Sequence, residues 1–249
     1  MQDERNQDQI TRKDAKNCFV ESLRDCFSFG RFHFTFASYD LTKPAGQRQT
    51  NQIQIYIPVG EFLNLCRKLE CGELRCQMQN RKQTGDRKPL YEILGGTSAE
   101  KLARQGRPRP DGRSLSRVMQ LLAGSKSDLL LVADSGPGDT TDKGLIVPRF
   151  GKNPENHVAV SMSFDLFAEL LLETKLHYQA WLSAWYAQGG QASGLSNAWH
   201  DSRHPQQAVT GKNPMQSRNP APELNAAPSA ALANPSEPDP YSYSTEAFF

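Results

Sequence analysis

The sequence predicts an α+β protein whose antiparallel β-sheet is built from two units, each a β-meander followed by a helix. Two segments carry this prediction because they match without a gap at a spacing of 105 residues: "NQIQIYIPVGEFLNLCRKLE" from Asn51 and "NHVAVSMSFDLFAELLLETK" from Asn156. In each segment the apolar residues first alternate, as in a half-buried strand, and then follow the spacing of an amphipathic helix. Gly60 and Asp165 hold equivalent positions at the predicted helix starts, where Asp can accept a backbone N–H bond.

The segments around the two repeats predict the remaining strands. "FSFGRFHFTFASYD" alternates Phe32, Phe34 and Phe36 with polar residues, and the aromatic row is predicted to be core rather than a stacking platform. "PLYEIL" from Pro89 and "SRVMQLLAG" from Ser116 are further strands. Antiparallel strands joined by turns leave the two helices to cover one face of the sheet.

The second helix, about residues 165–188, has the most continuous apolar stripe. Such a stripe predicts burial against the sheet, so Trp181 is expected to be a core residue. The stripe consists of Phe167, Leu170, Leu171, Thr174, Tyr178, Trp181, Leu182 and Trp185.

Composition divides the chain into four parts. The first residues are polar and of mixed sign, and 8 of the 16 prolines fall between Pro205 and Pro240, where no packed core is expected. The predicted parts are a polar N-terminal arm (1–25), a β-rich nucleic-acid-binding core (26–190), a disordered linker rich in Pro, Gly, Asn and Ala (191–236) and an acidic, aromatic tip (237–249).

The tip is predicted to be a docking peptide for replication or transfer proteins, because a flexible tether presents aromatic side chains among acidic ones. The alternative is a functionless terminus with incidental aromatics. The predicted docking residues are Tyr241, Tyr243, Phe248 and Phe249.

Charge and cysteine usage restrict the function. Residues 67–117 hold 13 Lys or Arg against 6 Asp or Glu, which favours an anionic partner. A signal peptide and a membrane-spanning run are both missing, so a cytoplasmic protein without membrane contact is expected. The 5 cysteines match neither a disulfide framework nor a zinc spacing, and neither a metal nor a cofactor is predicted.

Enzyme motifs are poorly represented. "SAEK", from Ser98 to Lys101, fits the S-x-x-K pattern of penicillin-recognising enzymes, but its companion motifs are missing. Ser98 or Thr97 starting a short helix, with Glu100 behind it, explains the same residues as a helix cap. The protein is therefore predicted not to be an enzyme.

Two features predict a nucleic-acid site. The segment 95–117 places arginines among prolines and glycines, as an open loop whose guanidinium groups can pair with phosphates or stack on bases. The outer sheet face is expected to expose Arg31, His33 and Thr35 beside Tyr56. The alternative for the loop is a solvated segment with compensating acids. The predicted nucleic-acid-binding residues are Arg31, His33, Tyr56, Arg104, Arg107, Arg109, Arg113, Arg117, Arg149 and Lys152.

The phrases "GGTSAEKLA", "RPRPDGRSLSR" and "SGPGDTTDKGLIVPRFG" resemble a poorly characterised family of small proteins carried on conjugative plasmids and integrative elements of Gram-positive bacteria. The resemblance implies a role in DNA processing, replication or transfer. The modular plan is similar to that of bacterial single-stranded DNA-binding proteins, and the paired units resemble Whirly-type, PUR-type or OB-like folds. The tip "STEAFF" departs from the usual consecutive aspartates and Pro-Phe end.

These observations predict a sequence-tolerant single-stranded DNA-binding protein that acts in replication or conjugative transfer of a mobile element. The alternative is a protein-binding accessory or regulator of the transfer machinery, not an enzyme, with duplex DNA as a candidate ligand. The sequence leaves oligomerisation and the preference for DNA or RNA open.

Overall fold

The computed structural model describes residues 7–44 and 46–190, and it confirms an α+β protein with antiparallel strands, although these form two sheets where the sequence predicted one. Sheet A has the order β1 (Gln9–Ala15), β2 (Cys18–Leu23), β3 (Arg31–Tyr39) and β4 (Gln49–Pro58). Sheet B has the order β5 (Tyr91–Thr97), β6 (Ser114–Ala123), β7 (Leu129–Thr140) and β8 (Ile146–Pro148), and β9 (Asn156–Met162) also pairs with β7. The helices are η1 (Phe27–Phe29), α1 (Val59–Glu70), α2 (Glu73–Thr84), α3 (Ala99–Arg104) and α4 (Phe164–Ala187).

The two repeated segments are strand-then-helix units, as predicted. β4 leads directly into α1, and β9 leads into α4 through one residue, Ser163. The Ser163 hydroxyl accepts a bond from the backbone N–H of Leu166 at 3.2 Å, so this serine caps α4 rather than Asp165. Pro58 precedes α1 without a side-chain cap, and Gly60 is already inside that helix. The helices therefore begin slightly before the positions that the sequence suggested.

The Phe32, Phe34 and Phe36 row is core, as predicted. The three side chains are at most 2% exposed, and strand register sets them opposite Ile57, Ile55 and Ile53. The ring of Phe62 from α1 stacks on Phe32 with 3.8 Å between centroids. One hydrophobic cluster includes residues from both sheets and from α1, α2 and α4, so the sheets share a core.

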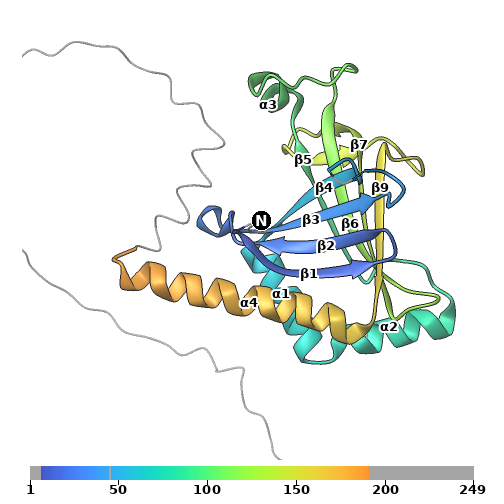
Figure 1. Cartoon of the computed structure of the whole chain (residues 1–249), viewed down its shortest axis with the longest axis vertical. Coiled ribbons are helices and arrows are strands. Elements are labelled where there is room, and N and C mark those ends of the chain that lie inside the picture. Colours follow the sequence, from blue (N-terminus) through green and yellow to red (C-terminus); the bar gives the residue numbers. More distant parts are fainter. Residues whose placement is uncertain (1–6, 45, 191–249) are drawn as a thin grey trace, which may run out of the picture. The chain divides into compact units, whose positions relative to one another are not determined.

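Helix α4 covers β1 and β2, and its burial ends near Tyr178. The hydroxyl of Thr174 donates to Ser22 Oγ of β2 at 2.7 Å, inside the core. Trp181 is only partly buried, although it packs near Phe27 with 5.8 Å between ring centroids. Figure 1 shows the last turns of α4 running past the ends of β1 and β2. Trp181 therefore packs against the edge of the core and not inside it, because α4 extends past β1 and β2 here.

The predicted N-terminal arm contains two strands of sheet A, which corrects the boundary at residue 26. The strand β1 was not evident because its core-facing side is polar. Lys13 lies on that side, and its Nζ contacts Glu169 Oε2 of α4 at 2.8 Å. A lysine stem can cover apolar surface while its ammonium pairs with a carboxylate, so an edge strand tolerates this sequence.

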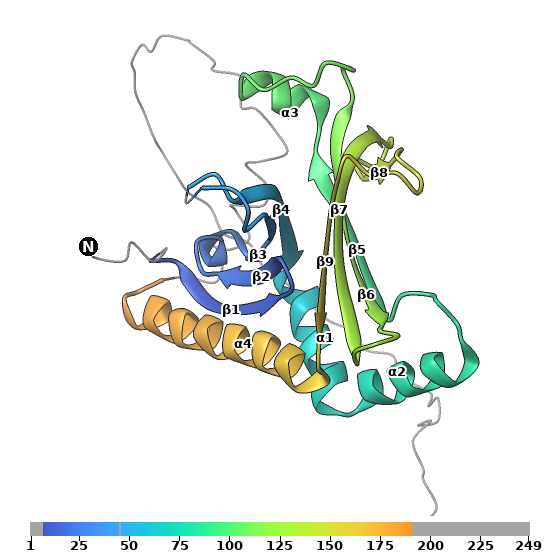
Figure 2. The ribbon, with the colours of Figure 1, turned by 45° about the vertical axis from the view of Figure 1, so that its right-hand side comes forward.

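Sheet B carries α3 and the arginine-rich connection at one end, and α2 lies near the other end (Figure 2). The predicted linker, the tip and the four docking residues Tyr241, Tyr243, Phe248 and Phe249 lie outside the described residues. Within the described part of the chain, the helices are too short or too polar to cross a membrane.

Candidate nucleic-acid interface

The outer face of sheet A is more covered than the sequence suggested. Arg31 is exposed, but His33 is only 4% exposed and Thr35 only 2%. The Tyr56 ring lies on the His33 ring with 4.5 Å between centroids and 22° between planes. The expected exposure of His33 and Thr35 is therefore wrong, and the ring of Tyr56 on the neighbouring strand covers His33.

Tyr56 is a half-buried member of this face. Its hydroxyl donates to Gln54 Oε1 at 3.1 Å, and burial raises the pKa of the phenol. One side of the ring packs on His33, so stacking on a base can use only the other side. Tyr56 lies on the outer face of sheet A, as the alternation predicted. This face is next to sheet B and is not an open platform.

Arg117 comes to the same place from sheet B. It lies near the start of β6, where strand register sets it between Gly95 of β5 and Ser135 of β7. Its Nη1 donates to Thr97 Oγ1 at 3.0 Å. Burial lowers the pKa of the guanidinium, while nearby Tyr56 acts in the opposite direction. Within residues 7–44 and 46–190, Arg117 has no carboxylate partner.

A small cavity joins these groups. It has a volume of about 50 Å³, enough for a few waters or one small anionic group but not for a whole nucleotide. We call it the junction pocket, because β3 and β4 of sheet A and β5 and β6 of sheet B all contribute to its wall. Its lining residues are Arg31, Gln54, Ile55, Tyr56, Ile93, Gly95, Gly96 and Arg117.

Gly95 makes room for the pocket. A side chain at Gly95 would share a face of sheet B with Arg117, since directly paired strand residues point the same way. A Cβ built there would meet nothing closer than the backbone oxygen of Arg117 at 4.0 Å. A glycine inside a strand often marks the close approach of a ligand or of another backbone, and this signal in "LGGT" could have indicated the pocket from the sequence.

The arginine-rich connection is more ordered and more neutralised than predicted. Arg109 forms a bidentate pair with Glu155 at 2.7 and 2.8 Å, and it also bonds to Asp111 at 2.9 Å. These carboxylates raise the pKa of Arg109, and Arg109 lowers the pKa of both acids. Arg109 therefore ties its loop to the segment before β9, and its charge is already matched.

Two further predicted arginines share a single acid. Arg113 Nη1 bonds to Asp139 Oδ1 at 3.1 Å, and Arg149 Nε bonds to Asp139 Oδ2 at 2.6 Å. The alternative, a loop whose charges are compensated by acids, is thus correct for Arg109. For Arg113 and Arg149, one carboxylate compensates two positive charges. Asp139 lies 26 residues from Arg113, so the spacing in the sequence gave no sign of the contact.

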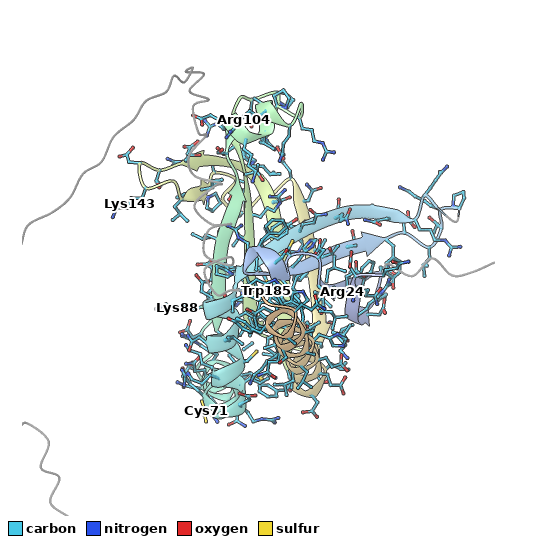
Figure 3. The ribbon with its side chains drawn as sticks, turned by 90° about the vertical axis from the view of Figure 1, so that its left-hand side faces the viewer. Arg24, Cys71, Lys88, Arg104, Lys143 and Trp185 are labelled. Carbon is cyan, nitrogen blue, oxygen red and sulfur yellow. The ribbon has the colours of Figure 1, made fainter. Side chains whose placement is uncertain are left out.

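The remaining predicted cations are exposed. Arg104 closes α3, and Figure 3 shows it at the end of the molecule opposite Cys71. Arg104, Arg107 and Lys152 form no ion pair within the part of the chain that the structure describes. Ser98 caps α3 by accepting a bond from the backbone N–H of Lys101 at 3.3 Å, which confirms the structural explanation of "SAEK". These cations surround the same end of sheet B as Arg117.

Comparisons with known proteins identify no relative, so the functional assignment rests on the geometry of the site. No family model matches the chain, and neither the curated proteins nor the solved structures contain a significant match.

Proposed function

We propose that the protein is a sequence-tolerant single-stranded DNA-binding protein and that the junction pocket anchors a phosphate of the strand. One observation carries the proposal: Arg117 is a half-buried cation that lines the junction pocket and has no carboxylate partner among the described residues. A partly desolvated charge is unfavourable without a counter-charge, so an anionic ligand beside Arg117 would be stabilised. The pocket beside Arg117 has room for a phosphate-sized group.

The surroundings of Arg117 fit a nucleic-acid backbone better than an isolated anion. Tyr56 offers one ring face beside the pocket, and Gln52 and Gln54 extend a row of amides along β4. Amides and aromatic rings contact bases without strong sequence preference. The exposed Arg104, Arg107 and Lys152 at the same end of sheet B supply the diffuse positive field that follows the backbone.

The topology gives the proposal a second, weaker support. Four strands precede α1, and a second meander precedes α4, an order that resembles Whirly-type and PUR-type single-strand binders. The family resemblance in "GGTSAEKLA" and its companion phrases favours a role in the replication or conjugative transfer of a mobile element. The C-terminal tip would then recruit replication or transfer proteins.

A protein-binding accessory is the second candidate, and one observation favours it. Three of the predicted DNA-contacting arginines already pair with Glu155, Asp111 or Asp139, as expected for a structured surface that meets another protein. Removing residues 241–249 separates the two functions. DNA affinity should stay equal or rise slightly, because the removed segment carries Glu246 and no basic residue, whereas capture of transfer proteins should be lost.

The proposal is tested by fluorescence anisotropy with labelled oligo-dT and a hairpin duplex at two salt concentrations. Oligo-dT should bind more tightly than the duplex, and its affinity should fall as salt rises because phosphate contacts release counterions. Arg87 provides a matched control, since it is exposed and precedes β5 at the opposite end of sheet B from Arg117. Arg117→Gln should weaken binding while Arg87→Gln should not. Preference for the duplex, or no binding to either, would reject the single-strand assignment.

A further inference from the structure

The corner of sheet A beneath Tyr56 holds three side chains with metal-binding chemistry. Asp25 and Cys26 follow β2, and His33 lies on β3. One potential ligand atom from each residue lies within 4.8 Å of the other two. The closest approach is between His33 Nδ1 and the two carboxylate oxygens of Asp25, each at 3.0 Å. This cluster lies outside the junction pocket, and the proposed DNA contacts do not use it.

Packing holds the histidine of this cluster in a fixed orientation. His33 is 4% exposed and is covered by the Tyr56 ring, and its second ring nitrogen, Nε2, is buried without a hydrogen-bond partner in the described residues. Asp25 is exposed and Cys26 is half-buried, so their side chains can move toward the histidine. The three residues thus offer one fixed imidazole and two adjustable ligands of the types that zinc accepts.

The thiol chemistry argues against a catalytic use of the same three residues. Burial, reinforced by the nearby Asp25 carboxylate, raises the pKa of Cys26 to about 12. A nucleophilic cysteine requires a lowered pKa, so this arrangement does not produce an activated thiolate at neutral pH. A metal ion reverses the situation, because a coordinated thiol loses its proton.

We propose that Asp25, Cys26 and His33 bind one zinc-class divalent cation through a carboxylate oxygen, the sulfur and an imidazole nitrogen. Zinc accepts this mixture of oxygen, sulfur and nitrogen ligands. Tetrahedral bonds of about 2.0 to 2.3 Å separate ligand atoms by about 3.3 to 3.5 Å, so the longest separation in the cluster, which is at most 4.8 Å, needs to shorten by up to about 1.3 Å. Three protein ligands leave the fourth position for water.

The binding step balances in charge and protons. The cation forms a bond to the Cys26 sulfur, and the thiol proton passes to solvent. The carboxylate of Asp25 gives up its contact with His33 Nδ1 to share the metal, and the imidazole proton moves from Nδ1 to Nε2 so that Nδ1 can bind the cation. The site gains one net positive charge, and the bound ion fixes His33, on which Tyr56 rests.

The test uses the full chain, freed of metal and titrated with Co²⁺ as a spectroscopic probe for Zn²⁺. One equivalent should produce the thiolate-to-cobalt charge-transfer band and the visible bands of tetrahedral Co²⁺, and Zn²⁺ should displace it. Zn²⁺ should also raise the melting temperature, since ligands of the native state stabilise it. Cys26→Ser should abolish the charge-transfer band and weaken affinity by at least about 10- to 100-fold.

Three controls keep the proposal open to refutation. Cys71→Ser removes an exposed thiol at the opposite end of the molecule from Arg104 and should bind the metal normally (Figure 3). The double change His200→Ala with His204→Ala removes two histidines that are not part of the proposed site, and it should also leave metal binding unchanged. If Cys26→Ser does not fold, Asp25→Asn tests the metal site instead, because it changes an exposed side chain. Absence of stoichiometric uptake, or full binding by Asp25→Asn and Cys26→Ser, would overturn the assignment.

Discussion

Arg109 and Arg117 stand 8 residues apart in the sequence and have opposite electrostatic surroundings. Arg109 bonds to two carboxylates, which raise its pKa, whereas the burial of Arg117 lowers its pKa and its bonded neighbour is the Thr97 hydroxyl. The first charge is used within the fold, and the second is available to a ligand. The comparison shows that an arginine-rich segment is not uniformly a binding surface, and that local pairing decides which of its charges can act.

The largest effect on DNA binding is expected from Arg117→Gln. Because the proposed contact between Arg117 and a phosphate is lost, the affinity for oligo-dT should fall by about 10- to 100-fold, as for a charge-assisted hydrogen bond. The melting temperature should stay equal or rise, because the change removes a buried charge without a carboxylate partner. Anisotropy and thermal melting of the same preparation measure both quantities. A lower melting temperature with unchanged affinity would make Arg117 a structural residue and reverse the comparison.

Tyr56→Ala should have a somewhat smaller effect on binding. Stacking of one base on an aromatic ring contributes about 1 to 3 kcal/mol, and only one ring face is available here, so a loss of about 5- to 20-fold is expected. The salt dependence should change little, since stacking releases few counterions. Tyr56→Phe keeps the ring and serves as the control. Equal losses for the two variants would assign the effect to the hydroxyl and not to stacking.

Gly95→Val tests the space of the junction pocket without changing any charge. The new side chain points to the same face as Arg117 and fills part of the cavity, so oligo-dT affinity should fall by roughly 3- to 10-fold, a large share of one phosphate contact. Gly95→Ala should have less effect because a Cβ fits at this position. Unaltered binding by the folded valine variant would show that the strand does not enter the pocket.

Arg109→Gln completes the comparison with the smallest effect on binding. The variant loses its pairs with Glu155 and Asp111, and the melting temperature should fall by about 2 to 4 °C, as for a loss near 1 kcal/mol. Affinity for oligo-dT should stay within about twofold, since the arginine offers no free charge. A drop in affinity as large as that of Arg117→Gln would mean that DNA displaces Glu155 from Arg109.

The sequence predicted the parts of the fold that periodicity controls. Apolar alternation followed by helical spacing located β4 with α1 and β9 with α4, because each element buries one regular face. It did not reveal β1, whose core-facing Lys13 depends on Glu169 in a helix 156 residues away. A polar edge strand has no periodic signal until its covering element is known.

The candidate site, like the fold, was predictable only where local sequence pattern decides the outcome. The sequence identified Arg31 and Tyr56 through strand alternation and Arg117 through the arginine-rich segment, and the fold brings these three together. It could not distinguish Arg109 from Arg117, because the distinguishing acid, Glu155, lies 46 residues from Arg109. It also treated His33 as exposed, since alternation along one strand does not indicate that Tyr56 covers it from the next. Asp25 and Cys26 carried no ligand spacing that would have suggested a metal.

The central claim is that Arg117, and not Arg109, contacts a phosphate. The most direct test is the slope of log affinity for oligo-dT against log salt, measured for the wild-type protein, Arg117→Gln and Arg109→Gln. Removing one protein–phosphate interaction with a single strand should reduce the magnitude of the slope by about 0.7. Arg117→Gln should show this reduction and Arg109→Gln should keep the wild-type slope. A wild-type slope in Arg117→Gln, or a reduced slope only in Arg109→Gln, would contradict the account.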